Sequence, residues 1–370
     1  MKRLLFPLIV VVLLAGCATP KPTPTIVPTP TPTTKYTFEQ ALQLVKVKVP
    51  ASSYMTNDYL PQEPVNNPTA GDQTKIKIKV GMPWILNDEE APFYNAIELG
   101  YYTEEGLDVT LEAGGPGKNH LQTLGGKAVD IAVVAGAIAV PMAVVSPTPI
   151  DVVVVGTFLK GMPYCYLTID PALQGKKLTA QDLVGTTIAV QSLQSGGDTY
   201  TKVLLDKQGI PYDKVSFIEG GYTIDVLLVG KAKFYTAWVV NQPRLAEEKG
   251  YQWNAMMYRD VAGGYDEYSD VIVVRRETLQ TPAGQDMVRR FLRATCRGTQ
   301  FLLSDPDRSA EIAVKYGVDA QLTKEQALWR FRQQETLVRG NDTLGLMHMD
   351  SRRWDEVVAT YVQYGQMQIQ

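Results

Sequence analysis

The sequence predicts an α/β protein built from two similar lobes, and the strand pattern is the first reason. Residues 75–80 alternate polar and apolar side chains strictly, as a strand with one buried face does. Further short, β-branched runs occupy residues 128–134, 150–155 and 187–190. These runs alternate with helical stretches such as residues 92–99, which is typical of largely parallel, buried sheets.

A short internal repeat is the second reason. The motif LGGKA, beginning at Leu124, returns as LVGKA at Leu228, each time between a helix-like and a strand-like segment. Glycine suits the end of a helix because it accepts the left-handed conformation. Since the motif occurs once in each half of the α/β region, it indicates two related lobes.

The N-terminus has the pattern of a bacterial lipoprotein signal. Lys2 and Arg3 precede an apolar stretch, residues 4–14, that is too short to span a bilayer as a finished helix. The sequence LAGC at residues 14–17 follows. We expect residues 1–16 to be a signal peptide and Cys17 to be the lipidated first residue of the mature chain, held outside the cytoplasm on the cell membrane.

The next segment, residues 17–74, is expected to connect the lipid to the folded part. Residues 19–34 are almost all Pro and Thr, a composition that favours extended backbone and would span roughly 50 Å at about 3.1 Å per residue. Residues 36–45 have the pattern of a short helix. We expect residues 35–74 to form a stalk that packs on the surface of the lobes.

The remainder divides into three parts. Residues 75–165 are expected to start the first lobe, residues 166–270 to form the second, and residues 271–370 to return to the first. Amphipathic helices are predicted in that last part at residues 287–303, 325–339 and 354–364.

Composition excludes several functions. The 370 residues are 45% apolar, and 36 basic side chains face 39 acidic ones without a basic block, which argues against nucleic-acid binding. Three cysteines and two histidines leave little for a disulfide scaffold, a zinc site or a His-dependent triad. We therefore expect neither a metal nor a cofactor.

Several motifs together resemble one family. The sequence GYYTEEGLDV at residues 100–109 is similar to the GYFKEEGLDV signature of extracytoplasmic solute-binding proteins of ABC importers. Supporting matches are GKAVDI at 126–131, DLVGTTIAV at 182–190 and RRFLRAT at 289–295. The branch that the chain resembles includes binders of thiamine pyrimidine precursors, riboflavin, alkylsulfonates and nitrate.

The resemblance implies a type II periplasmic-binding-protein fold, in which two α/β lobes close on a ligand like other hinged binding proteins. The two crossing strands would lie near Tyr164 and Asp270. It also implies a monomer that is not an enzyme and that delivers its small-molecule ligand to an ABC permease and its ATPase subunits.

Ligands of open α/β sheets meet the loops beyond the strand ends, so the candidate ligand-binding residues come from those loops. In the first lobe they are Trp84, Asn87, Tyr94, Gly114 and Gly136. In the second lobe and at its borders they are Tyr164, Gln191, Ser192, Ser195, Tyr222, Trp238, Asn241 and Tyr265. The aromatic members would stack on a planar ligand, whereas Ser195 would act at a helix N-terminus.

Other polar residues are assigned structural roles. The acidic run at residues 88–90 has the pattern of a solvated face, and His120 and His348 are too far apart in sequence to suggest a pair. Cys165 and Cys296 are expected to be free, buried thiols.

One absence bears on the ligand. No arginine occurs between Arg3 and Arg244, the region that supplies nearly all the candidate loops. Arginine is the preferred bidentate partner of carboxylate, sulfonate and phosphate. The sequence therefore favours a neutral, planar, hydrogen-bonding ligand, which within the resembled family means riboflavin or a thiamine pyrimidine precursor.

Three alternatives stay open. An alkylsulfonate, taurine or nitrate site would use amides near Ser195 together with Lys118. A pyrimidine-synthase-like enzyme that consumes bound pyridoxal phosphate shares the fold, but it relies on an active-site histidine and a Cys-rich motif, and this chain has no cluster of cysteines. A sensory or scavenging protein without a transporter is the third.

Overall fold

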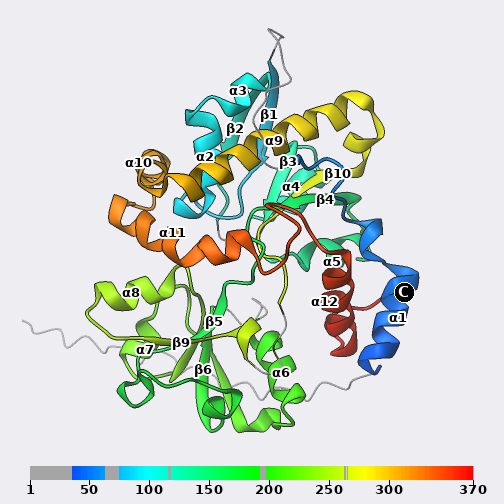
Figure 1. The fold of residues 1–370 in the computed structure, drawn as a ribbon. Coiled ribbons are helices and arrows are strands. Elements are labelled where there is room, and N and C mark those ends of the chain that lie inside the picture. Colours follow the sequence, from blue (N-terminus) through cyan, green and yellow to red (C-terminus); the bar gives the residue numbers. More distant parts are fainter. Residues whose placement is uncertain are drawn as a thin grey trace, which may run out of the picture.

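The computed structural model describes residues 36–62, 75–115, 118–191, 197–261, 264 and 266–369, although the side chains of residues 197–199 are excepted. Two five-stranded sheets organise this part of the chain, one in each lobe (Figure 1). The expected two-lobe α/β fold is thereby confirmed. Cys17, Ser192, Ser195 and Tyr265, whose roles are predicted from the sequence, lie outside the described residues.

The first sheet has the order β2-β1-β3-β10-β4. Its strands are β1 Ile76–Gly81, β2 Leu107–Glu112, β3 Ile131–Val134, β4 Val152–Thr157 and β10 Val271–Arg275. All are mutually parallel except β10, which pairs antiparallel with both β3 and β4. β3 and β4 are buried along their whole length, as expected of strands covered on both faces.

The second sheet repeats this plan in the order β7-β6-β8-β5-β9. Its strands are β5 Tyr164–Thr168, β6 Thr186–Val190, β7 Val215–Glu219, β8 Phe234–Trp238 and β9 Asn254–Met257. Here β5 is the antiparallel strand, pairing with β8 and β9. The fourth position of each sheet is thus held by the strand that adjoins a crossing between the lobes.

Helices cover both sheets. The helices of the first lobe are α1 Phe38–Lys48, α2 Ala91–Glu98, α3 Tyr101–Glu104, α4 His120–Gly125, α5 Ala139–Val144, α9 Pro282–Ser304, α10 Pro306–Tyr316, α11 Lys324–Arg339 and α12 Ser351–Gln363. Those of the second are α6 Gly197–Lys207, α7 Asp225–Leu228 and α8 Gln242–Glu248. The described residues also form short 3-10 helices, which in chain order are η1 Ala51–Ser53, η2 Asp88–Glu90, η3 Pro171–Leu173, η4 Ala180–Leu183, η5 Tyr212–Lys214, η6 Tyr258–Asp260 and η7 Arg276–Gln280.

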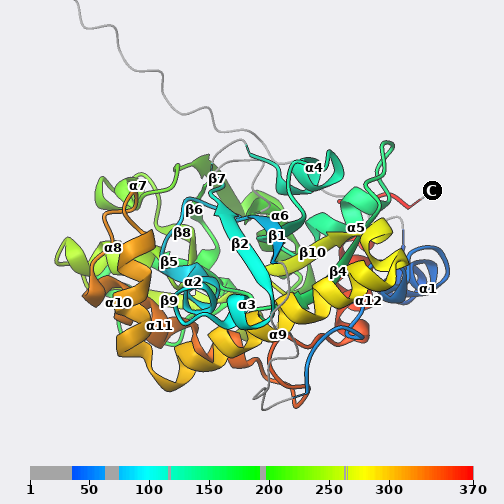
Figure 2. The ribbon, with the colours of Figure 1, turned by 90° about the horizontal axis from the view of Figure 1, so that it is seen from above.

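The segment expected to be a stalk is in part built into the first lobe. α1 lies along α12 at one end of the sheet (Figure 2), and its Ala41 and Val45 are fully buried. Met55 then forms a parallel bridge with Val154 of β4, and Tyr54 packs edge-on against Trp354 at 5.5 Å. Residues 36–60 therefore contribute apolar side chains to the hydrophobic core of the first lobe. They do not form a separate stalk on its surface.

The internal repeat marks two equivalent helix–strand connections with different geometry. Gly230 takes a left-handed φ of 67° after α7, as expected. After α4, however, the left-handed residue is Lys127 with φ 62°, and neither Gly125 nor Gly126 has positive φ. The motif therefore forms a helix–strand turn in both lobes, but the residue with positive φ stands at a different position and is a lysine in the first lobe and a glycine in the second.

Candidate functional site

The candidate site lies where the two sheets face each other across the crossings. The chain leaves the first sheet after Thr157 and enters the second at Tyr164; it returns between β9 and Val271. The two crossing segments hydrogen-bond each other: Phe158 N donates to Asp270 O at 3.1 Å and Ser269 N donates to Leu159 O at 3.0 Å. Two paired crossings near Tyr164 and Asp270 are what the resemblance implied, and the structure confirms them.

Aromatic side chains line the edge of the second sheet. Tyr164 at the start of β5 and Trp238 at the end of β8 are register partners with ring centroids 5.7 Å apart. The Tyr200 ring, from α6, lies 4.8 Å from the Tyr164 ring. Tyr164 and Trp238 remain partly exposed, so their rings offer a surface on which a planar ligand can stack.

Trp84 and Tyr222 meet across the lobes. Trp84 follows β1, Tyr222 follows β7, and their ring centroids are 5.3 Å apart. Tyr222 is 50% exposed, and its loop is held by a hydrogen bond from the Tyr235 hydroxyl to Gly221 O at 2.6 Å. Two residues predicted to stack on a ligand therefore contact each other in this structure.

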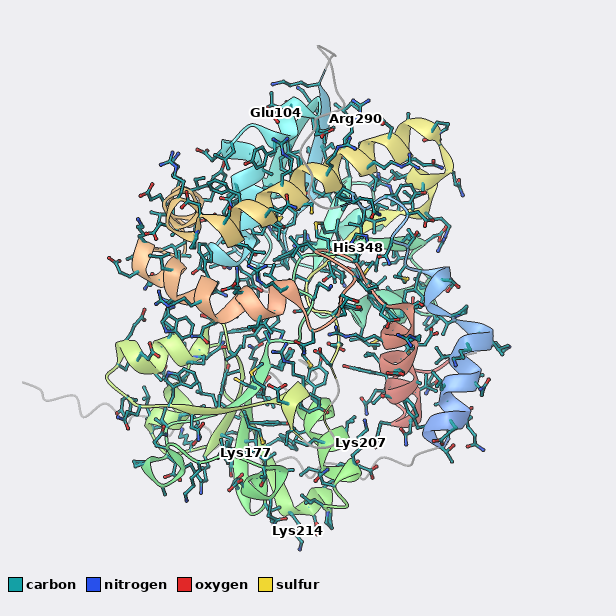
Figure 3. All side chains as sticks on the ribbon, viewed as in Figure 1. Glu104, Lys177, Lys207, Lys214, Arg290 and His348 are labelled. Carbon is teal, nitrogen blue, oxygen red and sulfur yellow. The ribbon has the colours of Figure 1, made fainter. Side chains whose placement is uncertain are left out.

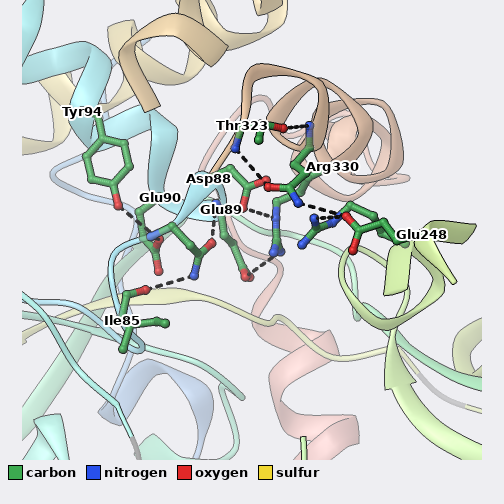
Figure 4. A network of polar contacts seen from close by, with 11 residues as sticks. Ile85, Asp88, Glu89, Glu90, Tyr94, Glu248, Thr323 and Arg330 are labelled. Atoms are coloured by element: carbon green, nitrogen blue, oxygen red, sulfur yellow. Dashed lines mark hydrogen bonds and ion pairs between the residues drawn. The ribbon is translucent and has the colours of Figure 1, made fainter. Parts of the chain in front are cut away.

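The acidic run at residues 88–90 is not a solvated face, and that expectation is wrong. Asp88, Glu89 and Glu90 form the turn η2 and are at most 8% exposed. Arg330 reaches them from α11: its Nε lies 2.6 Å from Asp88 Oδ1 and its Nη1 lies 3.2 Å from Glu89 Oε2 (Figure 4). The sequence pattern could not show this, because the neutralising arginine lies more than 200 positions downstream.

Burial shifts the acid groups towards their neutral forms. It raises the pKa of Glu89, and burial together with the neighbouring Glu89 raises the pKa of Glu90. Burial, followed by Glu89 and Glu90, raises the pKa of Asp270. On the return crossing, burial raises the pKa of Glu267 to about 8. This side of the site is therefore rich in hydrogen-bonding carboxyl groups.

Three predicted site residues have local structural roles. The Asn87 side chain accepts from Glu89 N at 2.8 Å and donates to Ile85 O at 3.0 Å, so its amide caps η2. Tyr94 is fully buried and stacks on Tyr316 at 4.3 Å, which places it between α2 and α10. A Cβ at Gly114 would lie 2.3 Å from Met82 O, so close backbone packing explains this glycine. The full burial of the Tyr94 ring argues against its direct contact with a ligand.

The other described candidates lie at strand or helix ends. Gly136 follows β3 with φ 76° and has open space where a Cβ would be. Gln191 follows β6, and its carbonyl accepts from Gly221 N at 3.1 Å. Asn241 is the N-cap residue of α8, yet its side chain makes no capping hydrogen bond. Its half-buried amide therefore has no capping role at this helix end.

The histidines and cysteines do not form a catalytic group. His120 is 8% exposed, and burial lowers its pKa. His348, near the middle of the view in Figure 3, contacts Leu346 O at 3.0 Å through Nδ1. Cys165 and Cys296 are free and buried, as expected. Within the described ranges, no three His, Cys, Asp or Glu side chains are arranged to hold a metal ion.

Most basic side chains of the described residues near the crossings are paired, but Arg259 is an exception, because its nearest carboxylate is Asp260 Oδ1 at 3.6 Å and its buried Nε and Nη1 make no hydrogen bond. Arg330 is paired with two carboxylates, and Lys118 donates to Ala113 O at 2.7 Å. Lys177 and Lys214 lie in the second lobe before strands β6 and β7 begin, away from the crossings (Figure 3). Arg330 is nevertheless a residue that the sequence did not place at the site.

Comparison with known proteins agrees with this architecture. The family model described as NMT1/THI5 like matches residues 87–309. The chain is 22% identical over 307 residues to the formylaminopyrimidine-binding protein of Halalkalibacterium halodurans, covering 79% of this chain and 87% of that protein. It is 25% identical over 309 residues to the riboflavin-binding protein RibY of Chloroflexus aurantiacus, covering 80% and 84%.

Solved structures share the fold. The ligand-binding component of an ABC-type import system from Staphylococcus aureus has a TM-score of 0.56 at 13% identity, covering 79% of this chain and 93% of that one. The aliphatic sulphonate binding protein SsuA from Escherichia coli has a TM-score of 0.54 at 14% identity, covering 70% and 83%. Within the described part of the chain, every helix is too short or too polar to cross a membrane.

Proposed function

Since the chain belongs to the NMT1/THI5-like family and is an ABC-type substrate-binding protein, we propose that it captures a planar heterocyclic vitamin or vitamin precursor between its lobes. The ligand would be riboflavin or a thiamine pyrimidine precursor, and the protein would hand it to an ABC permease. The chain acts by binding and is not an enzyme.

The aromatic wall formed by Tyr164, Trp238 and Tyr200 carries this proposal. Each stacking contact contributes about 0.5–1.5 kcal/mol beyond the burial of apolar area. With several hydrogen bonds, two or three such contacts support the roughly 8–12 kcal/mol that micromolar to nanomolar binding requires. The names of the two relatives support the same ligand class, because one binds a formylaminopyrimidine and the other riboflavin.

An anionic ligand is the rival; Arg259, whose Nε and Nη1 make no hydrogen bond within the described residues, is a donor that such a ligand could use, but the buried carboxyl groups beside the crossing argue against it. A sulfonate needs uncompensated donors such as a free guanidinium. Asp88, Glu89, Glu90 and Asp270 gather beside the crossing, and Arg330 is already paired with the first two. The likeness to sulphonate-binding structures is a likeness of fold.

Isothermal titration tests the proposed function. The chain would carry Cys17→Ser and retain residues 36–62, because these belong to the core of the first lobe. It would be titrated with riboflavin, a formylaminopyrimidine and taurine. We expect a heterocycle to bind with micromolar or tighter affinity and taurine not to bind; tight taurine binding without heterocycle binding would contradict the proposal.

We also propose that the protein is a lipoprotein outside the cytoplasm, attached through Cys17 and tethered by residues 19–34. The signal pattern LAGC and the Pro/Thr composition support this. Metabolic labelling with palmitate should mark the wild-type chain and not Cys17→Ser. Equal labelling of both would contradict lipid attachment at this residue.

A further inference from the structure

The helices α8 and α11 bring the two lobes into contact on one flank of the molecule. α8 belongs to the second lobe and α11 to the first, and both ribbon views place them on the same side (Figure 1 and Figure 2). Trp329 Nε1 of α11 donates to Glu247 Oε2 of α8 at 2.8 Å. Gln326 Nε2 of α11 donates to Glu248 Oε1 of α8 at 2.9 Å. Two hydrogen bonds between side chains therefore join the lobes here.

Each glutamate is held in position from within its own lobe. Trp253 Nε1, from the loop before β9, donates to the other oxygen of Glu247, Oε1, at 2.8 Å. Arg244, one turn earlier on α8, donates to Glu248 Oε1 at 2.7 Å. Side chains that are already ordered lose less rotamer freedom when a further partner arrives. Both carboxylates are therefore prepared to accept a hydrogen bond from the first lobe.

The donor Gln326 is also fixed. It is the N3 residue of α11, and its Oε1 accepts from Thr323 N at 3.0 Å in a capping box. This contact leaves the Nε2 group free to donate to Glu248, which Figure 4 shows beside the start of α11. Hydrogen bonds to an ionised acceptor are roughly twice as strong as those between neutral groups. The two helices thus present complementary surfaces, with donors on α11 and carboxylates on α8.

These contacts lie far from the crossings about which the lobes turn. Leu337 O, near the end of α11, accepts from Gly161 N of the outgoing crossing at 2.9 Å. Trp329 and Gln326 lie about two to three turns earlier in the helix, a distance of about 12–17 Å at 1.5 Å per residue. Val240, just before α8, is fully buried in a hydrophobic core that includes Leu337. The buried ends of the two helices therefore stay with the crossings, whereas their more exposed ends can separate.

We infer that Glu247 and Glu248 form a latch with Trp329 and Gln326 that holds the lobes in the closed arrangement. The hydrogen bonds that each glutamate makes within the second lobe persist when the lobes part, whereas those to α11 are lost. A contact made in only one of two arrangements shifts the equilibrium towards that arrangement. The latch therefore favours closure whichever ligand the protein binds, and a failure of the proposed function would leave this inference standing.

Pulsed electron spin resonance measures the separation of the lobes without added ligand. Spin labels would be attached at Val229→Cys in the second lobe and at Val318→Cys in the first, on a chain that carries Cys17→Ser. The two valines are 65% and 71% exposed, whereas Cys165 and Cys296 are buried and escape labelling. We expect a distance distribution with a well-populated short component, which reports the closed arrangement.

Trp329→Phe keeps an aromatic ring and removes the donor, so it should lower the ratio of the short to the long component about tenfold. Trp253→Phe is the matched control, because it removes the donor of the second lobe from the same carboxylate. It should keep the wild-type ratio. Equal distributions in wild type and Trp329→Phe, or equal shifts in the two Phe variants, would overturn the inference.

A charge swap tests the second contact. Gln326→Glu retains the capping box, because glutamate also serves at N3, but it places a carboxylate against Glu248. It should lower the short component at least as strongly as Trp329→Phe. Adding Glu248→Gln restores one donor and one acceptor, so the double variant should recover the wild-type distribution. Failure of Gln326→Glu to open the lobes, or failure of the double variant to close them again, would overturn the inference.

Discussion

The rings of Trp84 and Tyr222 join the two lobes at a point away from the crossings. Trp84 belongs to the loop after β1 in the first sheet and Tyr222 to the loop after β7 in the second, and their centroids are 5.3 Å apart. A hinged binding protein must separate such a pair before its ligand can leave. The pair is therefore expected to slow the release of ligand.

Trp84→Ala or Tyr222→Ala should raise the ligand dissociation rate. An aromatic pair contributes about 0.5–1.5 kcal/mol, which corresponds to a change of roughly two- to tenfold. Stopped-flow measurement of dissociation checks this, with Tyr251→Ala as control because Tyr251 is a similarly exposed tyrosine of the second lobe. A dissociation rate equal to wild type in both variants would show that the pair does not restrain opening.

The positions of the strands and helices illustrate how much the sequence could predict. β1, β3, β4 and β6 coincide with the alternating or β-branched runs, since these patterns follow directly from burial on one or both faces of a sheet. The helices α9, α11 and α12 were likewise indicated by their apolar periodicity.

The site was predictable only in part, because it depends on contacts between distant segments. Tyr164 and Trp238 were found from their position at strand ends. The sequence did not place Arg330 or Glu267 beside the crossings, although Asp270 was expected near one of them. Nothing local distinguishes a buried Glu89 from a solvated one when its partner Arg330 lies on α11.

Trp238→Ala should weaken ligand binding about tenfold, or about 1.4 kcal/mol, because it removes a ring from the wall beside Tyr164. Trp238→Phe retains an aromatic face and should keep most of the affinity. Titration calorimetry gives both affinities, and thermal unfolding of the empty protein gives the control. A large fall in the unfolding midpoint of the Phe variant would assign Trp238 mainly to the core, against which part of it packs.

Two adjacent glutamates of the GYYTEEGLDV motif should differ sharply in their effect on stability. Glu105 is fully buried and forms a two-pronged ion pair with Arg293, at 2.7 and 2.8 Å. Glu104 pairs with Arg297, but 44% of its side chain is exposed. Removing one partner of a buried pair costs about 3–5 kcal/mol, whereas an exposed pair contributes about 0–1 kcal/mol.

Glu105→Ala should therefore lower the free energy of unfolding in urea by about 3–5 kcal/mol, and Glu104→Ala by less than about 1 kcal/mol. Neither should change ligand affinity in the folded protein, because both side chains pair with α9 just before β2 begins, whereas the candidate ligand-binding loops follow the strand ends. Similar losses in the two variants would contradict the assignment of Glu105 as the structural residue of the motif.

Glu267 should make the folded protein less stable as the pH rises. Burial raises its pKa to about 8 in the folded state, whereas the value in an unfolded chain is near 4.5. Between these values the native state binds a proton that the unfolded state has lost, so the free energy of unfolding decreases with increasing pH. Above about pH 8 the buried carboxyl ionises in both states, and this contribution no longer changes.

Glu267→Gln should remove this part of the slope. Its amide oxygen can still accept from the Tyr200 hydroxyl, so packing is retained while the titration is lost. Urea unfolding between pH 5 and 9 should show wild type losing stability relative to the variant, by an amount on the order of 4 kcal/mol if the full shift is expressed. The other buried acids, Glu89, Glu90 and Asp270, remain in both proteins and cancel in the comparison. Parallel pH profiles for wild type and Glu267→Gln would mean that this carboxyl has the same pKa in the folded and unfolded chains. Water would then reach the carboxyl beside Tyr200 in the folded protein.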